Sequence, residues 1–451
     1  MPTSPEASTS PETPDNRVAN QQREHGDHDS KPLRLLIAAD TFPPNINGAA
    51  KFTVNLASSM AARGHDVHVV VPSADRYHGT AQETYDGQTF TVHRLPSDRW
   101  WPHDWLRYVK PWRARHWMRK KLAEIKPDVV HYQSAVVLGR AVVREARAYP
   151  ELRVIGTNHL MLENLLEHTM LIKPLQRLGS KIWWADARKT FAATDALTTP
   201  TRRAADFLES NGGIGHVLAI SCGLRKSDYT ADWNEKPVKR IAFVGRVTGE
   251  KRIDVLIKAF AKLPNHAELR FDIVGDGDLR GTLERLAKEQ GVAEQVVFHG
   301  RVSDEQLRGI YRDATVFAIA STAELQSIAT MEAMASGLPV VAANAMALPH
   351  LVHDGVNGYL FPPNDVDACA EALQRVLDAP HEQRVKMGRA GYDMVDMHDI
   401  DATMTLFERL YRGESADDVA KDSANEQDHS LDNVVEAVTG SIPTVRPDTA
   451  Q

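Results

Sequence analysis

One stretch of the 451-residue chain decides how it folds: Glu324-Leu-Gln-Ser-Ile-Ala-Thr-Met-Glu-Ala-Met-Ala-Ser-Gly-Leu-Pro-Val-Val341. An apolar run typical of a buried strand, Thr315 to Ala320, precedes it, and a second such run covers Pro339 to Ala343. Small residues and a glycine mark the end of a helix between the two runs. The pattern predicts a strand–helix–strand unit with one carboxylate, Glu324, before the helix and another, Glu332, two turns inside it.

These two carboxylates flank a helix start. The first backbone N–H groups of a helix have no intrahelical acceptor and lie at the positive end of its dipole, so they suit a phosphate. Carboxylates on both sides of that phosphate can accept hydrogen bonds from hydroxyl groups. A nucleotide-sugar has this layout, with ribose, diphosphate and sugar in series. The alternative interpretation is a surface acid and a solubilising acid on an ordinary βα unit.

Short apolar runs alternate with amphipathic segments along most of the chain. One series begins with the strand predicted at Leu33–Ala39, and a second begins at Arg240. Such alternation predicts a parallel sheet covered by helices on both faces. At this length, two domains are expected. The fold class is therefore α/β, with two doubly wound Rossmann-like domains whose strands have their carboxyl ends facing across a cleft.

Three loops add candidate site residues. Arg246 and Lys251 lie in the loop after the first strand of the second series, where two cations suit a diphosphate. Gly48 lies in the loop after the first strand of the chain, and glycine permits close approach of a phosphate. His159 follows the strand predicted at Arg153–Thr157 and can bond a sugar hydroxyl or shuttle a proton. A lone histidine is more often structural.

The Glu-x7-Glu element and the following Ala-Met-Ala-Ser-Gly-Leu-Pro-Val-Val resemble the signature of family 4 of the retaining GT-B glycosyltransferases, the group 1 type. The resemblance implies that Glu324 faces the donor sugar and that Glu332 bonds the ribose. The Gly-Arg…Glu-Lys loop resembles the donor loop of that family, which implies contacts from Arg246 and Lys251 to the β-phosphate. These cations imply a reaction without a metal or other cofactor.

The resemblance extends, less completely, to other positions. His159 matches the histidine of the family that lies beside the donor sugar, and Thr-Asn-His-x-x-x-Glu-Asn-Leu resembles enzymes that glycosylate diacylglycerol-type lipids or phosphatidylinositol. Only Gly48 of the family's Gly-Gly pair is present. The family's Gly-Phe-Gly after the first Glu is replaced by Leu325-Gln-Ser327, where the backbone N–H of Ser327 is still expected to face the donor.

Composition separates the tails from the core. Residues 414–451 hold nine acids and two bases, and residues 1–31 hold six acids and three bases, so the rest of the chain carries a net +3 although the whole carries −7. Both tails are predicted to be disordered. The two cysteines, Cys222 and Cys369, give no disulfide framework, and no Cys/His cluster has metal spacing. The absence of a long apolar run and of a signal-peptide core predicts a cytoplasmic location.

The predicted divisions are a disordered N-terminal tail, an acceptor-side Rossmann-like domain, a linker, a nucleotide-sugar-binding Rossmann-like domain, a helix that crosses back to the first domain, and a disordered acidic tail. Their bounds are 1–31, 32–227, 228–237, 238–395, 396–413 and 414–451.

Residues 99–121 combine five of the eight tryptophans with eight Lys or Arg residues and one acid. Tryptophan and cations together favour an anionic membrane surface. The residues predicted at this interface are Trp100, Trp101, Trp105, Trp112, Arg113 and Arg115. A core-packing helix with a solvated basic face is the alternative. Nucleic-acid binding is not expected, because no second basic stripe supports it.

The sequence thus predicts a retaining hexosyltransferase that uses a UDP- or GDP-sugar and acts on a membrane glycolipid precursor, bound peripherally at the inner face of the plasma membrane. The first alternative is a soluble saccharide or small-molecule acceptor. The second is a GT-B nucleotide-sugar epimerase, which needs no acceptor, and the third is a binding module without activity.

Overall fold

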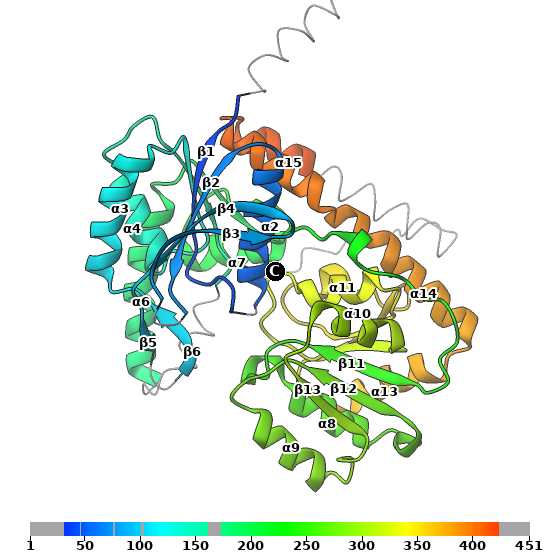
Figure 1. Cartoon of the computed structure of the whole chain (residues 1–451). Coiled ribbons are helices and arrows are strands. Elements are labelled where there is room, and N and C mark those ends of the chain that lie inside the picture. Colours follow the sequence, from blue (N-terminus) through cyan, green and yellow to red (C-terminus); the bar gives the residue numbers. More distant parts are fainter. Residues whose placement is uncertain (1–30, 46, 75–76, 101–102, 161–172, 424–451) are drawn as a thin grey trace, which may run out of the picture.

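The computed structural model describes residues 31–45, 47–74, 77–100, 103–160 and 173–423. Two α/β domains follow one another in the chain, and the C-terminal helices run along the side of both (Figure 1). Each domain has its own sheet, as the alternation of strands and helices predicts.

The first domain contains an eight-stranded sheet with the order β10-β9-β8-β7-β1-β2-β4-β3 and a separate β5-β6 ribbon. All neighbours in the large sheet are parallel except the β3–β4 pair. The strands are β1 (Arg34–Ala38), β2 (Asp66–Pro72), β3 (Gly79–Tyr85), β4 (Gln88–Leu95), β5 (Asp98–Trp100), β6 (His103–Tyr108), β7 (Val129–Tyr132), β8 (Arg153–Thr157), β9 (Ala196–Thr199) and β10 (Leu218–Ala219).

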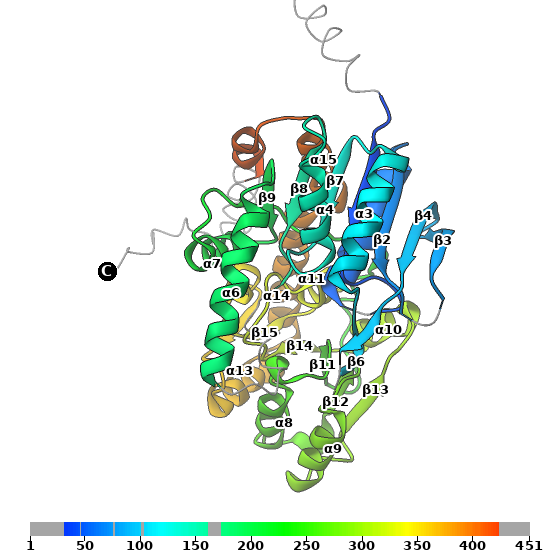
Figure 2. The same cartoon turned by 90° about the vertical axis from the view of Figure 1, so that its left-hand side faces the viewer.

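Helices cover both faces of this sheet (Figure 2). One face packs against α3 (Pro111–Ile125), α4 (Leu138–Ala146), α6 (Lys173–Phe191) and α7 (Arg202–Gly212). The other face packs against α2 (Gly48–Ala62) and against α15 (Ile400–Tyr411), which returns from the far end of the chain. The first domain is therefore completed by residues that follow the second.

The second domain has a six-stranded parallel sheet with the order β13-β12-β11-β14-β15-β16. Its strands are β11 (Arg240–Val244), β12 (Arg270–Val274), β13 (Val296–Gly300), β14 (Val316–Ile319), β15 (Val340–Ala343) and β16 (Gly358–Phe361). Its α-helices are α8 (Ile253–Ala261), α9 (Arg280–Glu289), α10 (Asp304–Asp313), α11 (Ile328–Ala335), α12 (Leu348–Leu351), α13 (Val366–Asp378) and α14 (His381–Met394). Short 3₁₀ turns are η1 (Lys226–Asp228), η2 (Gly249–Lys251), η3 (His266–Glu268) and η4 (Val395–His398).

Residues 414–423 correct one prediction. They lie in the acidic tail expected to be disordered, yet residues 416–423 are helical and Val419 is fully buried in the core beneath α2 and α15. Asp422 forms an ion pair with Arg409 at 2.6 Å, and the Ser423 hydroxyl donates to the Ala219 carbonyl at 3.0 Å. The burial of Val419 and the ion pair with Arg409 of α15 order this segment, although its sequence contains few apolar residues. The remaining tail residues, 1–30 and 424–451, lie outside the described ranges.

The hairpin of β3 and β4 has no counterpart among the predicted strands. Its turn, Asp86-Gly87, has both residues at positive φ, which this tight reversal requires. Strand β3 is largely exposed and polar, so it lacks the apolar run by which the other strands are identified.

Across the described parts of the chain, no helix combines the length and apolarity that a bilayer crossing needs.

We predict that Val419→Ala lowers the free energy of unfolding by about 1–2 kcal/mol, because two methyl groups leave a fully buried site. Urea unfolding followed by tryptophan fluorescence measures this change. The matched control is Val297→Ala, which removes the same groups from a side chain that is 38% exposed. Equal losses in the two variants would show that residues 414–423 do not stabilise the first domain.

Candidate functional site

The starts of α2 and α11 lie against each other where the two domains meet. A β-carbon on Gly48, the first residue of α2, would lie 3.6 Å from Ile328 Cδ1, at the first residue of α11. Helix α2 follows the carboxyl end of β1, and α11 follows the carboxyl end of β14. The carboxyl ends of both sheets therefore point toward one junction, which is the usual position of a ligand in doubly wound folds.

The start of α11 is built from an unusual backbone. Ser327, its N-cap residue, has φ +76° and ψ +78°, in the left-handed region that favours glycine. Its hydroxyl pairs with the Thr330 hydroxyl at 2.8 Å and caps no backbone amide. The Ser327 side chain turns into the protein, which leaves the backbone as the part of Ser327 suited to an anionic ligand.

The loop that carries Arg246 and Lys251 is hydrogen-bonded to the segment that follows the carboxyl end of β14. Arg246 donates to Glu250 Oε1 at 2.8 Å, and Thr248 donates to the same oxygen at 2.7 Å. Burial raises the pKa of Glu250, but the Arg246 charge and the Thr248 hydrogen bond bring it below its ordinary value. The Glu250 carbonyl accepts from the Thr322 amide at 3.0 Å. Glu250 is therefore an ionised residue that holds the loop in place.

Lys251 and Glu324 are in direct contact, Nζ to Oε1. Their side chains are only 15% and 11% exposed. The sequence places these two residues 73 positions apart and predicts neighbouring but separate roles for them. The ammonium balances the charge of Glu324 and keeps two further N–H donors, which suit phosphate oxygens.

Glu332 is the fifth residue of α11, about one turn from its start, and is 9% exposed. Its Oε1 accepts from the Tyr229 hydroxyl at 2.7 Å, and its Oε2 accepts from the Tyr311 hydroxyl at 3.0 Å. Burial raises the pKa of Glu332, and these hydrogen bonds oppose the rise. Neither tyrosine stands out in the sequence, because each is a single aromatic residue in an unremarkable segment.

Gln326 is a residue that sequence reasoning treats only as a departure from the family pattern. Its Oε1 accepts from the Cys222 amide at 2.7 Å, and its Nε2 donates to Ser221 Oγ at 2.7 Å. One residue earlier, the Leu325 carbonyl accepts from Thr201 Oγ1 of the first domain at 2.9 Å. The loop that carries Glu324 is therefore attached to the first domain and to the connection between the domains.

His159 lies beyond the end of β8, with its ring centroid 4.6 Å from that of Phe52 in α2. Its Nε2 is buried and has no hydrogen-bond partner among the described residues. Burial lowers the pKa of His159 to about 3, so the imidazole is neutral at physiological pH. A neutral ring with a free nitrogen can accept or donate one hydrogen bond to a ligand hydroxyl.

The residues predicted at a membrane interface belong to the first domain. Trp112 is 66% exposed at the start of α3, and Arg113 beside it is exposed. Arg115 instead bonds the buried Glu145 at 3.0 Å, so its charge is balanced within the protein. The side chains of Trp100 and Trp105 and the whole of Trp101 lie outside the described part of the structure.

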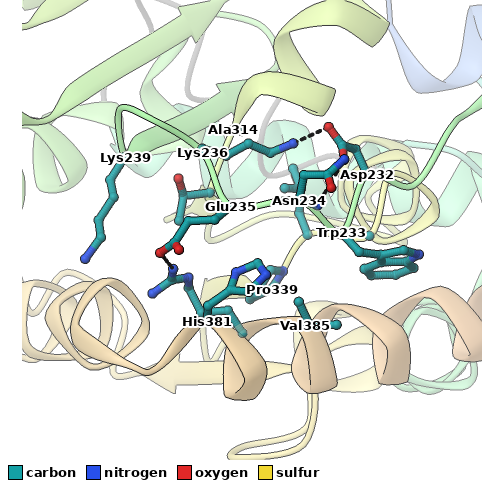
Figure 3. A pocket seen from close by; sticks show the side chains of 14 residues that line it. Asp232, Trp233, Asn234, Glu235, Lys236, Lys239, Ala314, Pro339, His381 and Val385 are labelled. Atoms are coloured by element: carbon teal, nitrogen blue, oxygen red, sulfur yellow. Dashed lines mark hydrogen bonds and ion pairs between the residues drawn. The ribbon is translucent and has the colours of Figure 1, made fainter.

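Figure 3 shows a pocket between the linker and α14. It is lined by Asp232, Trp233, Asn234, Glu235, Lys236, Lys239, Ala314, Thr315, Gly337, Leu338, Pro339, His381, Arg384 and Val385. Lys239, Thr315 and Pro339 directly precede strands β11, β14 and β15. The pocket therefore lies at the amino ends of the strands, opposite Glu324 and Lys251, and it contains none of the predicted site residues.

The described residues contain no group of three or more His, Cys, Asp or Glu side chains arranged to hold a metal ion.

Comparisons with known proteins match nearly the whole two-domain region. The family model described as Glycosyltransferase Family 4 matches residues 46–225, and that described as Glycosyl transferases group 1 matches residues 228–394. The chain is 24% identical to the sulfoquinovosyl transferase SQD2 of Arabidopsis thaliana, covering 83% of this chain and 72% of the relative. It is also 24% identical to the alpha-monoglucosyldiacylglycerol synthase of Acholeplasma laidlawii, covering 74% and 86%.

Among solved structures, the sucrose-phosphate synthase from Thermosynechococcus elongatus aligns with a TM-score of 0.71 at 21% identity, covering 84% of this chain and 98% of the other. This likeness confirms the predicted GT-B arrangement of two Rossmann-like domains.

We predict that Gln326→Leu lowers the free energy of unfolding by about 1–3 kcal/mol, because the buried Cys222 amide loses its side-chain acceptor and the Ser221 hydroxyl loses one of its hydrogen bonds. Urea unfolding gives the change. Gln374→Leu is the matched control, since the side-chain bond of Gln374 to Asp378 in α13 is exposed to solvent. A loss no greater than that of the control would contradict the anchoring role of Gln326.

Proposed function

We propose that this chain, which belongs to the family 4 glycosyltransferases of the group 1 type, transfers a hexose from a nucleotide diphosphate-sugar to a membrane glycolipid precursor with retention of anomeric configuration. The observation that carries the proposal is the direct contact of Lys251 with Glu324 beside the start of α11. In this contact, the Lys251 cation suited to a phosphate and the Glu324 carboxylate suited to a sugar hydroxyl lie together beside a helix start.

The donor would lie along α11. Lys251 and Arg246 would neutralise the diphosphate as it leaves, which is electrostatic stabilisation of developing charge. Glu324 would accept from a hydroxyl of the transferred sugar, and Glu332 would accept from the ribose. Gly48 at the start of α2 carries no side chain and would let a donor phosphate approach its backbone closely. No step in this scheme requires a metal ion.

His159 would act on the acceptor side of the sugar. It comes from the first domain, whereas the donor residues come from the second. Its Nε2, which has no hydrogen-bond partner within the described part of the chain, is suited to a hydroxyl of the sugar or of the acceptor. Because burial keeps the pKa of His159 at about 3, it would serve as a neutral hydrogen-bonding group over the physiological pH range.

A lipid acceptor is favoured by the start of α3. Trp112 and Arg113 place an exposed aromatic ring beside an exposed cation on the acceptor-side domain, a combination suited to anionic headgroups. The similarity to a diacylglycerol glucosylating enzyme supports the same choice. A soluble saccharide acceptor is the second candidate, and the vesicle experiment below separates the two. An epimerase would convert the donor sugar without any acceptor.

Donor turnover tests the proposal directly. The purified protein is incubated with UDP-glucose, GDP-mannose and related donors, with and without diacylglycerol or phosphatidylinositol, and release of nucleoside diphosphate is measured. We expect activity with one donor class that persists in EDTA. Activity that EDTA abolishes and magnesium or manganese restores would overturn the metal-free scheme.

We predict that Arg246→Ala and Lys251→Ala each weaken binding of the matching nucleoside diphosphate by roughly tenfold to a hundredfold, because a charge-assisted hydrogen bond contributes about 1.5–3 kcal/mol. Titration calorimetry measures the affinity. Lys236→Ala removes an equal charge at the far end of the sheet, where Lys236 bonds Asp232, and is the control. Unchanged affinity in both site variants would remove these residues from the donor site.

We also predict co-sedimentation of the protein with vesicles rich in anionic lipid, weakening at high salt as electrostatic attraction is screened. Trp112→Ala, alone and with Trp100, Trp101 and Trp105 replaced by Ala, should reduce the bound fraction. Tyr77→Ala, which changes an exposed aromatic residue elsewhere in the first domain, is the control. Absence of binding at low salt would make a soluble acceptor the better proposal.

A further inference from the structure

We propose that Tyr229, a residue of the linker between the domains, is a positioning residue for nucleotide recognition: its hydroxyl fixes Glu332 in the orientation that bonds the ribose and ties that orientation to the linker. The inference rests on the proposed role of Glu332 and assigns a function to a residue outside the donor signature.

The geometry around Glu332 is a three-element arrangement. Tyr229, directly after η1, donates to Oε1 at 2.7 Å, and Tyr311 of α10 donates to Oε2 at 3.0 Å. A carboxylate offers about four lone-pair sites, so one site on each oxygen stays available for ribose hydroxyls. The two phenols thus fix the plane of the carboxylate without occupying all of its lone-pair sites.

Ring packing shows why Tyr229 holds the carboxylate permanently rather than occupying the place of a ribose hydroxyl. The Tyr229 ring packs against the core of the second domain and meets the Tyr311 ring edge-on, with centroids 6.3 Å apart. Tyr311 is fully buried, and its single hydroxyl proton is shared between Glu332 Oε2 and the Ala329 carbonyl, 3.2 Å away. Swinging Tyr229 away would expose its ring and break this aromatic contact.

The linker follows α11 along its length. Trp233 packs at the other end of the helix, where a β-carbon on Gly337 would lie 2.7 Å from its ring. Upstream, the Leu224 amide donates to the His398 carbonyl at 2.7 Å, and the Ile400 amide donates to the Leu224 carbonyl at 3.2 Å. Leu224, just before the linker, is therefore bonded to residues 398–400, where the chain crosses back to the first domain. A shift of the linker would move Tyr229 relative to the Glu332 carboxylate.

The pKa of Glu332 distinguishes the two possible roles of Tyr229. It would change if the Tyr229 hydroxyl holds the carboxylate, and it would not change if Tyr229 only packs against its neighbours. Burial raises the pKa of Glu332, the hydroxyls of Tyr229 and Tyr311 and the Lys51 charge from α2 lower it, and Asp304 at the start of α10 raises it. Removing one hydroxyl withdraws a group that stabilises the charged form. The carboxylate of the variant will then become protonated at a higher pH than in the wild type.

The test compares Tyr229→Phe, Glu332→Gln and the double variant by titration calorimetry with the nucleoside diphosphate of the active donor, from pH 5 to 8. Tyr392→Phe is the matched control. It removes a phenol hydroxyl near the linker, where Tyr392 meets Trp233 and Lys226 but not Glu332. Circular dichroism and urea unfolding show whether each variant is folded.

We expect Tyr229→Phe to weaken binding by about threefold to thirtyfold, since a hydrogen bond to a charged group is lost while the ring is kept. Glu332→Gln keeps only the pH dependence that comes from the ligand phosphate, whose second pKa is about 6. Measured against that profile, the low-pH loss of affinity should begin at a higher pH in Tyr229→Phe than in the wild type. When Glu332→Gln is already present, adding Tyr229→Phe should weaken nucleoside diphosphate binding little further, because the two residues act through one contact.

Each contrary outcome has its own meaning. Wild-type affinity and pH profile in Tyr229→Phe, with weakened binding in Glu332→Gln, would overturn the inference and leave the proposed role of Glu332 standing. Tighter binding in Tyr229→Phe would overturn it in favour of a hydroxyl that competes with the ribose. Unchanged binding in Glu332→Gln would overturn the proposed role of Glu332 itself, and the inference with it.

Discussion

The candidate site of this glycosyltransferase depends on the buried carboxamide of Gln326. Its hydrogen bonds to the Cys222 amide and the Ser221 hydroxyl connect the loop after β14 to the segment that leaves the first domain. Glu324 precedes this residue, and the left-handed turn at Ser327 follows it. With both amide groups satisfied in the interior, the loop has one favourable position, since any shift leaves buried polar groups without partners. The directions of Glu324 and of α11 follow from that position.

Three charged pairs or clusters at the junction are held by contacts within the protein. Arg246 bonds Glu250, Lys251 bonds Glu324, and Glu332 is held by two phenols. Partners of this kind offset the cost of removing charges from water, and they also fix directions before a substrate arrives. The pairs differ in what they leave available. Glu250 is committed to the loop, whereas Lys251 keeps N–H donors and Glu332 keeps lone pairs for a ligand.

Much of this arrangement follows from the sequence, and the exceptions have physical reasons. The apolar runs before Glu324 and after Gly337 determine β14, α11 and β15, because strands buried on both faces must be continuously apolar. The hairpin at 79–95 is not found by such reasoning, because β3 is largely exposed and polar and so has no continuous apolar run. Contacts between residues far apart, such as Tyr229 with Glu332, depend on how the linker lies against α11, and no local pattern encodes that. The helix at 416–423 shows how a single buried valine can order an acidic segment.

The return of α15 to the first domain has a consequence for synthesis of the chain. Ile400, Met404 and Phe407 are buried in the same core as Phe52 and Leu56, with Val419 beside them. While the chain is emerging from a ribosome, the first 227 residues can form their sheet, but the face that also carries α2 stays partly uncovered until residues 400–419 have been made. The second domain, whose core comes almost entirely from residues 241–395, can close earlier. The domain made first is thus finished last, and its uncovered apolar face is where a chaperone would bind during translation.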